Sequence, residues 1–183
     1  MAWEMTWVFT QQKFWELLTA PYYYPDMIWM VIPLVTTLLV MQLYFGRYSK
    51  EEMGWNTAVG NTLVLFFISL DLLRNVYNIP PADLINFFYY PVKTTVAMLV
   101  GVEALTLFFA DFFRFLPKRL AFFISSPLPV NLTAYVAITL VYSHLTFDRY
   151  LLLAALLLFA ILFVIIHVLQ YIVQFVWESP ETV

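Results

Sequence analysis

The chain has 183 residues, of which 63% are hydrophobic and only 11% are charged, with a formal net charge of −3. A soluble domain has roughly 25% charged residues, so this composition excludes an ordinary soluble fold and indicates a chain that is partly solvated by lipid. The nine Lys and Arg residues are scattered, which argues against a nucleic-acid partner, since binding one would need a basic face or stripe. The absence of cysteine excludes disulfides, thiolate catalysis, cysteine-ligated zinc and iron–sulfur clusters.

The first predicted element is a short amphipathic helix over residues 9–19, in which aromatic and leucine side chains are interspersed with Gln, Lys and Glu. An amphipathic segment that carries a tryptophan, here Trp15, and precedes a membrane span is typical of a helix lying in the interface. Pro21, Pro25 and the three tyrosines between them form the aromatic collar expected at headgroup depth.

Five apolar stretches are each long enough, as helices, to cross or nearly cross the hydrocarbon core. The predicted spans cover residues 27–45, 55–73, 92–116, 130–146 and 149–177. A second interfacial stretch, residues 75–90, precedes the third span. We therefore predict an all-α integral membrane protein with about five transmembrane helices and two short interfacial helices, forming a single transmembrane domain over residues 1–183.

Residues 120–129 are apolar but broken by Ser125-Ser126-Pro127 and by Pro129. Three interpretations of this stretch stay open: an interfacial piece, a re-entrant piece, or the beginning of a longer, tilted fourth span that starts at Ala121.

The sequence also suggests an internal repeat. Tyr23-Tyr24-Pro25 and Tyr89-Tyr90-Pro91 each introduce an apolar span that is followed by an arginine, Arg47 in one case and Arg114 in the other. The hypothesis is two parallel repeats of interfacial helix, span and return span, so the first and third spans should run in the same direction. The alternative is that aromatic entry and basic exit are common to membrane helices in general.

The basic residues predict an orientation. Loops 46–53 and 114–119 hold the densest basic run, Arg114, Lys118 and Arg119, so they are placed on the cytoplasmic side. This puts the N-terminus outside and the C-terminus inside, with the cell membrane as the expected location.

Glu103 is the leading candidate for a functional side chain. At about 1.5 Å per residue it lies roughly 16 Å into the third span, close to the middle of a hydrocarbon core about 30 Å thick. Thr106 and Asp111 share its helix face. An intramembrane carboxyl group can exchange a proton or bind a cation, so these residues, with Asn61 of the second span, are the candidates for an ion or proton path. The alternative is a structural carboxyl group that holds its helix against a neighbour.

Other polar or small residues in the spans fit roles in helix packing or charge neutralisation. Small, amide and imidazole groups let helices approach closely or hydrogen-bond across an interface, which predicts packing roles for Asn56, Gly60, Gly101 and His167. Charges three residues apart on a helix can neutralise each other at the membrane boundary, which predicts two ion pairs, Asp71 with Arg74 and Asp111 with Arg114.

No metal or cofactor is predicted. His144 and His167 would lie roughly 25 Å apart in depth, which argues against a haem held by both histidines of one chain, although a pair formed between two chains stays open. Signatures of metalloproteases, serine hydrolases and nucleotide-binding loops are missing from the sequence, so an enzyme is not expected.

Two classes of function remain. The first is a homo-oligomeric channel or transporter for protons or cations, in which Glu103 lines the path. The second is a non-catalytic structural or accessory subunit of a membrane complex. An intramembrane enzyme acting on lipid comes third, because it needs two polar groups converging at one depth. The expected partners are the lipid bilayer and either further copies of the chain or other membrane subunits.

Overall fold

A computed structural model describes residues 2–48, 51 and 53–177, and this part of the chain is helical without any strand. The helices are α1 (Ala2–Tyr23), α2 (Ile28–Arg47), α3 (Trp55–Tyr77), α4 (Asn86–Tyr89), α5 (Pro91–Phe112), α6 (Lys118–Ile124), α7 (Pro127–Tyr142) and α8 (Arg149–Trp177), with a single 3₁₀ turn, η1 (Pro25–Met27), before α2. The predicted all-α class is confirmed.

Five segments of the described chain are long and apolar enough to cross a membrane: Pro25–Arg47, Trp55–Tyr77, Pro91–Phe112, Lys118–Tyr142 and Arg149–Val176. Their number agrees with the prediction. Mean hydropathy reaches 3.1 in the last segment, which is dominated by Leu, Ile, Val and Phe. Such composition is compatible with a membrane location, because lipid can solvate helices whose outer faces are apolar.

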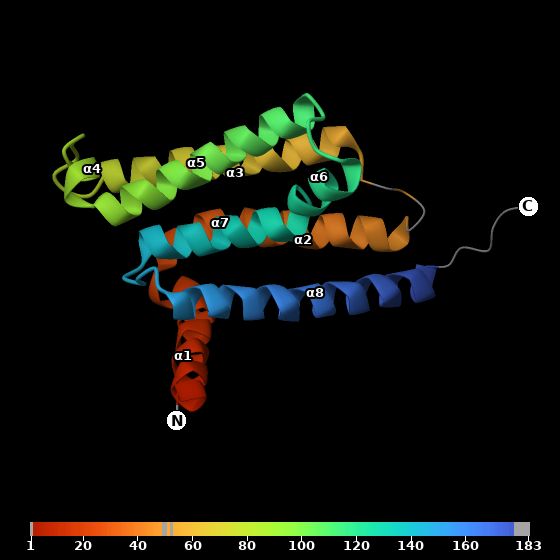
Figure 1. Ribbon diagram of the computed structural model, residues 1–183, viewed down its shortest axis with the longest axis horizontal. Helices are drawn as coiled ribbons and strands as arrows, with labels where there is room; N and C mark the ends of the chain where they lie inside the picture. Colours follow the sequence, from red (N-terminus) through yellow and green to blue (C-terminus); the bar gives the residue numbers. More distant parts are fainter. Residues whose placement is uncertain (1, 49–50, 52, 178–183) are drawn as a thin grey trace, which may run out of the picture.

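The spanning helices form a layered bundle (Figure 1). Helices α3 and α5 make an antiparallel pair on one side, α2 and α7 lie in the middle, and α8 covers the opposite side. Helix α7 is the central element, since it packs against α2, α3, α5 and α8. Its buried residues include Ala134, Ile138 and Val141, which join one apolar core with residues of α2, α3 and α5.

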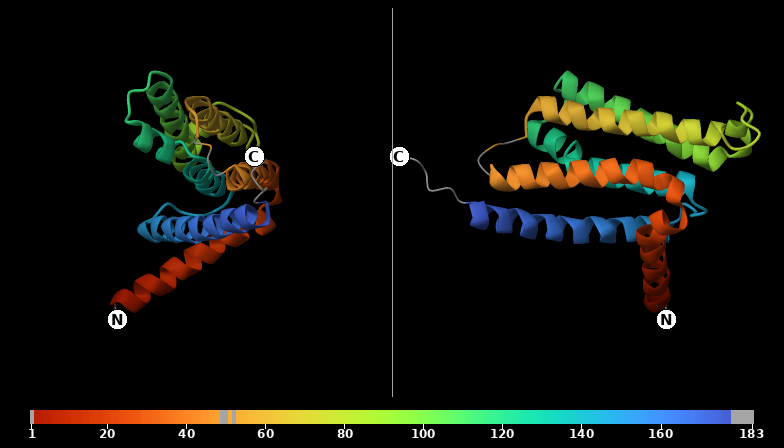
Figure 2. Two further views of the ribbon diagram at one scale, coloured as in Figure 1. Left: turned by 90° about the vertical axis from the view of Figure 1, so that its right-hand side faces the viewer. Right: turned by 180° about the vertical axis from the view of Figure 1, so that it is seen from behind.

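Helix α1 is longer than predicted, Ala2–Tyr23 instead of 9–19, because the preceding residues contain neither Gly nor Pro to end a helix. It runs across one end of the bundle and projects away from it, as both views in Figure 2 show. Its inner end is fixed by Leu17, which is fully buried and whose carbonyl oxygen accepts a hydrogen bond of 2.6 Å from Tyr135 Oη of α7. Trp3 and Trp7 are exposed. This placement is the one expected of an interfacial helix.

The third span ends earlier than predicted, at Phe112 instead of residue 116. Arg114 adopts a left-handed backbone conformation with φ of 56°. The amide of Phe115 then donates to the carbonyl of Ala110, and the amide of Arg114 donates to that of Asp111. This pattern is the Schellman motif, which satisfies the last carbonyl groups of a helix and stops it.

The fourth span is also corrected, from residues 130–146 to two successive helices, α6 and α7, that end at Tyr142. Ser126 is extended, and Pro127 then occupies the first turn of α7, where a missing amide hydrogen costs nothing. The prolines therefore start a helix here instead of breaking one. At the other end, Ser143 is extended and terminates α7. Of the three interpretations of residues 120–129, a longer fourth span lies nearest to the structure.

Of the features that the repeat hypothesis predicts, the structure shows only the common direction of the first and third spans. Helices α2 and α5 run the same way, although any chain of alternating spans gives that result (Figure 1). Their lead-in elements differ, because α1 has 22 residues and α4 has only four. The loop before α5 is instead organised by the Asn86 side chain, whose Nδ2 lies 2.7–3.0 Å from the carbonyl oxygens of Tyr77, Ile79 and Pro81.

Candidate functional site

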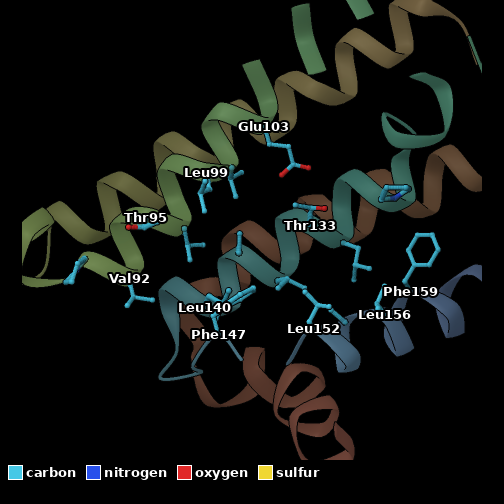
Figure 3. A pocket seen from close by; sticks show the side chains of 18 residues that line it. Val92, Thr95, Leu99, Glu103, Thr133, Leu140, Phe147, Leu152, Leu156 and Phe159 are labelled. Carbon is cyan, nitrogen blue, oxygen red and sulfur yellow. The ribbon is translucent and has the colours of Figure 1, made fainter. Parts of the chain in front are cut away.

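A groove of about 660 Å³ lies between α5, α7 and α8 (Figure 3). Helix α7 forms its floor, because α5 and α8 both pack on α7 while neither is a principal neighbour of the other. The lining residues recur every three or four positions along each helix, so each helix presents one face to the groove. Val92, Leu99 and Leu156 are each exposed over more than half of their surface, so the groove opens sideways, away from the bundle.

The groove is almost entirely apolar at the end that Val92, Leu140, Phe147 and Leu152 line (Figure 3). Glu103 of α5 enters it further along, and Thr133 of α7 lines the groove opposite (Figure 3). The groove therefore changes in polarity along its length.

Glu103 is half-buried at this position. Within the described chain, no hydrogen bond or ion pair reaches its carboxyl group. A charged carboxylate surrounded by hydrocarbon is expensive, so Glu103 is stable here only when it is neutral or when a bound molecule supplies a donor.

The four residues predicted to form an ion path lie in three separate places. Glu103 is in the groove, whereas Thr106 is exposed on α5 and donates its hydroxyl hydrogen to the carbonyl of Val102 at 2.7 Å. Asn61 and Asp111 are brought together elsewhere, at the junction of α3, α5 and α6. The predicted path is therefore not continuous through the described chain.

Ser125 is the residue that joins Asn61 and Asp111. Its hydroxyl donates to Asp111 Oδ2 at 2.6 Å, and its carbonyl accepts a hydrogen bond of 2.8 Å from Asn61 Nδ2. Asp111 is only 1% exposed, and its other oxygen has no partner in the described structure. Ser125 was predicted only as part of a break in the fourth span. The signal for its role is that it is the first polar residue in an otherwise apolar stretch.

Only one of the two predicted boundary ion pairs forms. Arg74 Nη2 and Asp71 Oδ1 are 2.5 Å apart, and Tyr142 Oη donates a hydrogen bond of 2.8 Å to Asp71 Oδ2. The prediction of a pair between Asp111 and Arg114 is wrong. The left-handed backbone at Arg114 leaves its guanidinium group 5.5 Å from the ring centre of Trp55, a cation–π contact, while Asp111 bonds to Ser125.

Of the residues predicted to pack helices together, Gly101 lies at a close approach. A Cβ atom there would come within 2.5 Å of Ser69 Oγ on α3. Gly60 and Asn56 are exposed, and a Cβ atom at Gly60 would meet nothing within 4 Å, so neither lies at a close helix contact within the described chain. Gly46 was not predicted as a packing residue, but a Cβ atom there would lie 3.2 Å from Gln170 Cα of α8.

His167 does not join two helices of the described chain, because it is exposed and its Nδ1 lies 2.8 Å from the carbonyl oxygen of Phe163 in its own helix. It lines a second cleft of about 400 Å³ between α2, α8 and the α6–α7 junction. Gln42 and Gln170 meet in this cleft through a hydrogen bond of 2.7 Å from Gln170 Nε2 to Gln42 Oε1. Because both are amide side chains within apolar spans, the sequence could have predicted that they bond to each other or to another polar group.

His144 lies at the opposite end of α7, beside Tyr24, with ring centres 5.9 Å apart. The described residues contain no cluster of three or more His, Cys, Asp or Glu side chains that could hold a metal ion. No family model, curated protein or solved structure matches this chain, so its function is argued from its own residues.

Proposed function

We propose that the protein is a non-catalytic accessory protein of the membrane, which binds the hydrocarbon tail of a lipid in the groove between α5, α7 and α8. The observation that carries this proposal is that the groove is apolar and opens sideways, with exposed Val92, Leu99 and Leu156 along it. A volume of about 660 Å³ falls within the range of roughly 300–1,000 Å³ typical of small-molecule sites.

A lipid tail suits the groove better than a second copy of the chain. A neutral Glu103 carboxyl group can lie beside a lipid tail, whereas a protein partner that bound its charged form would have to supply a cation. The described Lys and Arg residues lie at or near the ends of the spanning helices, as Arg74, Lys93 and Arg149 do, or in α1 at one end of the bundle, as Lys13 does, so another copy brings no cation to the depth of Glu103.

The experiment is photolabelling of the full-length protein in vesicles with a lipid that carries a diazirine in its tail. Ala155 lines the groove, so Ala155→Phe should fill it and reduce labelling of α5 and α7 several-fold. Ala160→Phe is the matched control, because Ala160 is exposed on the same helix and outside the groove. Equal labelling of both variants and the wild type would overturn the proposal.

A second function, proton or cation conduction at an interface between copies, is favoured by one observation: Glu103 is half-buried near the middle of α5 without a partner. The test is flux into liposomes, with Glu103→Gln as the variant because it keeps the shape and removes the charge. Flux that is lost in the variant while the oligomeric state is unchanged would support this function. Absence of flux in both proteins would exclude it.

The proposed orientation follows the basic residues. Arg114, Lys118 and Arg119 lie at the end of the bundle where α2 and α5 finish and α3 begins. By the positive-inside rule this end faces the cytoplasm, with α1 at the outer surface of the cell membrane.

A further inference from the structure

The groove and the second cleft are adjacent. Pro129 of α7 and Phe159 of α8 line both of them, so the space along α5, α7 and α8 meets the cleft beside α2 at these two residues. Figure 3 places Phe159 at the end of the groove remote from Val92 and Phe147.

Polarity increases in one direction from the groove to the cleft. The end of the groove away from the cleft is lined by Leu140 and Phe147. Glu103 and Thr133 lie nearer to the cleft, and the polar residues that line the cleft include Ser126, His167 and three glutamines. The cleft lies near the C-terminal end of α2 and beside α6, so it is close to the end of the membrane span, where lipid head groups are found. A single molecule with an apolar tail and a polar head matches this gradient.

We propose that the groove and the cleft together form one site for a single amphiphilic lipid whose head group is uncharged and bears hydroxyl groups. This inference rests on the proposed function, which supplies the position of the tail, and it adds the chemistry of the head group.

The polar atoms of the cleft define that chemistry. Gln42 is only 7% exposed, its oxygen accepts from Gln170, and its amide nitrogen donates no hydrogen bond within the described chain. His167 Nδ1 carries its hydrogen towards the Phe163 carbonyl, because a carbonyl oxygen only accepts, and this leaves Nε2 of the neutral ring as an acceptor. The cleft thus offers both free donors and free acceptors, which hydroxyl groups can satisfy together.

An anionic head group does not fit. None of the described residues that line the cleft is Lys or Arg, whereas Glu51 lines it with a carboxylate that accepts a hydrogen bond of 2.6 Å from Tyr44 Oη. A phosphate here would face a like charge, and none of the described residues that line the cleft would supply a cation to neutralise it.

The experiment compares two photoactivatable lipids with identical diazirine tails, diacylglycerol with a free hydroxyl head and phosphatidic acid with a phosphate head, in vesicles of phosphatidylcholine. Wild-type protein should be labelled more by diacylglycerol, with the labels mapping to α5, α7 and α8. Equal labelling, or stronger labelling by phosphatidic acid, would overturn the inference.

Gln174→Lys sharpens the test, because Gln174 lines the cleft and a cation there should shift the preference towards phosphatidic acid by about tenfold. Gln11→Lys, on the exposed surface of α1, is the matched control and should leave the preference unchanged. An unchanged preference in folded Gln174→Lys protein would overturn the placement of the head group. The wild-type comparison needs no variant, so it is decisive even when Gln174→Lys fails to fold.

The outcomes separate the two proposals. Loss of groove labelling in Ala155→Phe without any head preference in the wild type would retain the proposed function and overturn this inference. Labelling that Ala155→Phe does not reduce would overturn the proposed function itself.

Discussion

Helix α5 has one closed face and one open face, and the difference between them follows from side-chain size. Towards α3 it presents Ala97, Gly101 and Ala104, and the hydroxyl of Ser69 donates to the carbonyl of Ala97 at 2.9 Å. Towards α8 it presents larger side chains such as Val92 and Leu99, and no helix covers them. Small residues allow close backbone contact, so α3 seals one face while the other stays available for a ligand.

The two carboxyl groups of α5 follow the same division. Asp111 is sealed at the junction with α6 and bonded to Ser125, whereas Glu103 is half-buried in the groove without a partner in the described chain. The first is part of the fold, and the second is the polar group of a candidate site. Mutations on the closed face should therefore affect stability more than mutations on the open face.

The largest effect is expected at Gly101. A Cβ atom there would lie 2.5 Å from Ser69 Oγ, so Gly101→Ala must displace Ser69 or separate α3 from α5. We expect the free energy of unfolding in detergent micelles to fall by roughly 1–3 kcal/mol. At Gly60 the space is open, and Gly60→Ala should leave stability unchanged or raise it by up to about 1 kcal/mol, because alanine favours helix. Equal effects of the two substitutions would contradict the close approach of α3 and α5.

A comparable effect, coupled between two residues, is expected at Asp111 and Ser125. Either Asp111→Ala or Ser125→Ala leaves a buried polar group without its partner, which should cost roughly 1–3 kcal/mol of unfolding free energy. The double variant should cost clearly less than the sum of the two, because no orphaned partner remains. A double-mutant cycle in the same micelles measures this coupling, and strict additivity would show that the hydrogen bond does not contribute.

The smallest effect is expected at Glu103. Glu103→Leu breaks no hydrogen bond of the described structure and places an apolar side chain in an apolar groove. The free energy of unfolding should change by no more than about 0.5 kcal/mol or should rise. A decrease in the free energy of unfolding as large as that of Gly101→Ala would mean that Glu103 stabilises the fold, and would contradict its role as a ligand-binding group.

The sequence was sufficient for the class and number of spans, because hydropathy over about 20 residues reflects the thickness of the bilayer. Helix α8 was predicted with its observed bounds, Arg149–Trp177. The end of α5 was missed because Arg114 is not a glycine, the residue that usually marks a left-handed stop. The fourth span began too late in the prediction because Pro127 and Pro129 were read as breaking a helix when they lie in its first turns.

The groove itself could not be predicted, because it depends on which helices do not pack together. Periodicity identifies the faces of a helix but not its neighbours, so Gly60 and Gly101 looked alike in the sequence and only Gly101 meets another helix. Glu103 was predicted from the sequence as a carboxyl group near the middle of its helix, and the structure places it half-buried in the groove. The sequence did not show that Asp111 and Asn61 lie away from Glu103, because both are held at the α6–α7 junction by hydrogen bonds to Ser125.

The pairing of the helices also determines the order in which they can pack during synthesis. Helix α2 packs chiefly against α7 and α8, and α3 is not among its principal neighbours. Since translation runs from the N-terminus, the first span to enter the bilayer must wait for the fourth and the fifth to be made, whereas α3 and α5 can pair as soon as the third emerges. Helix α2 must therefore be stable alone in lipid during this interval, which its mean hydropathy of 1.9 allows.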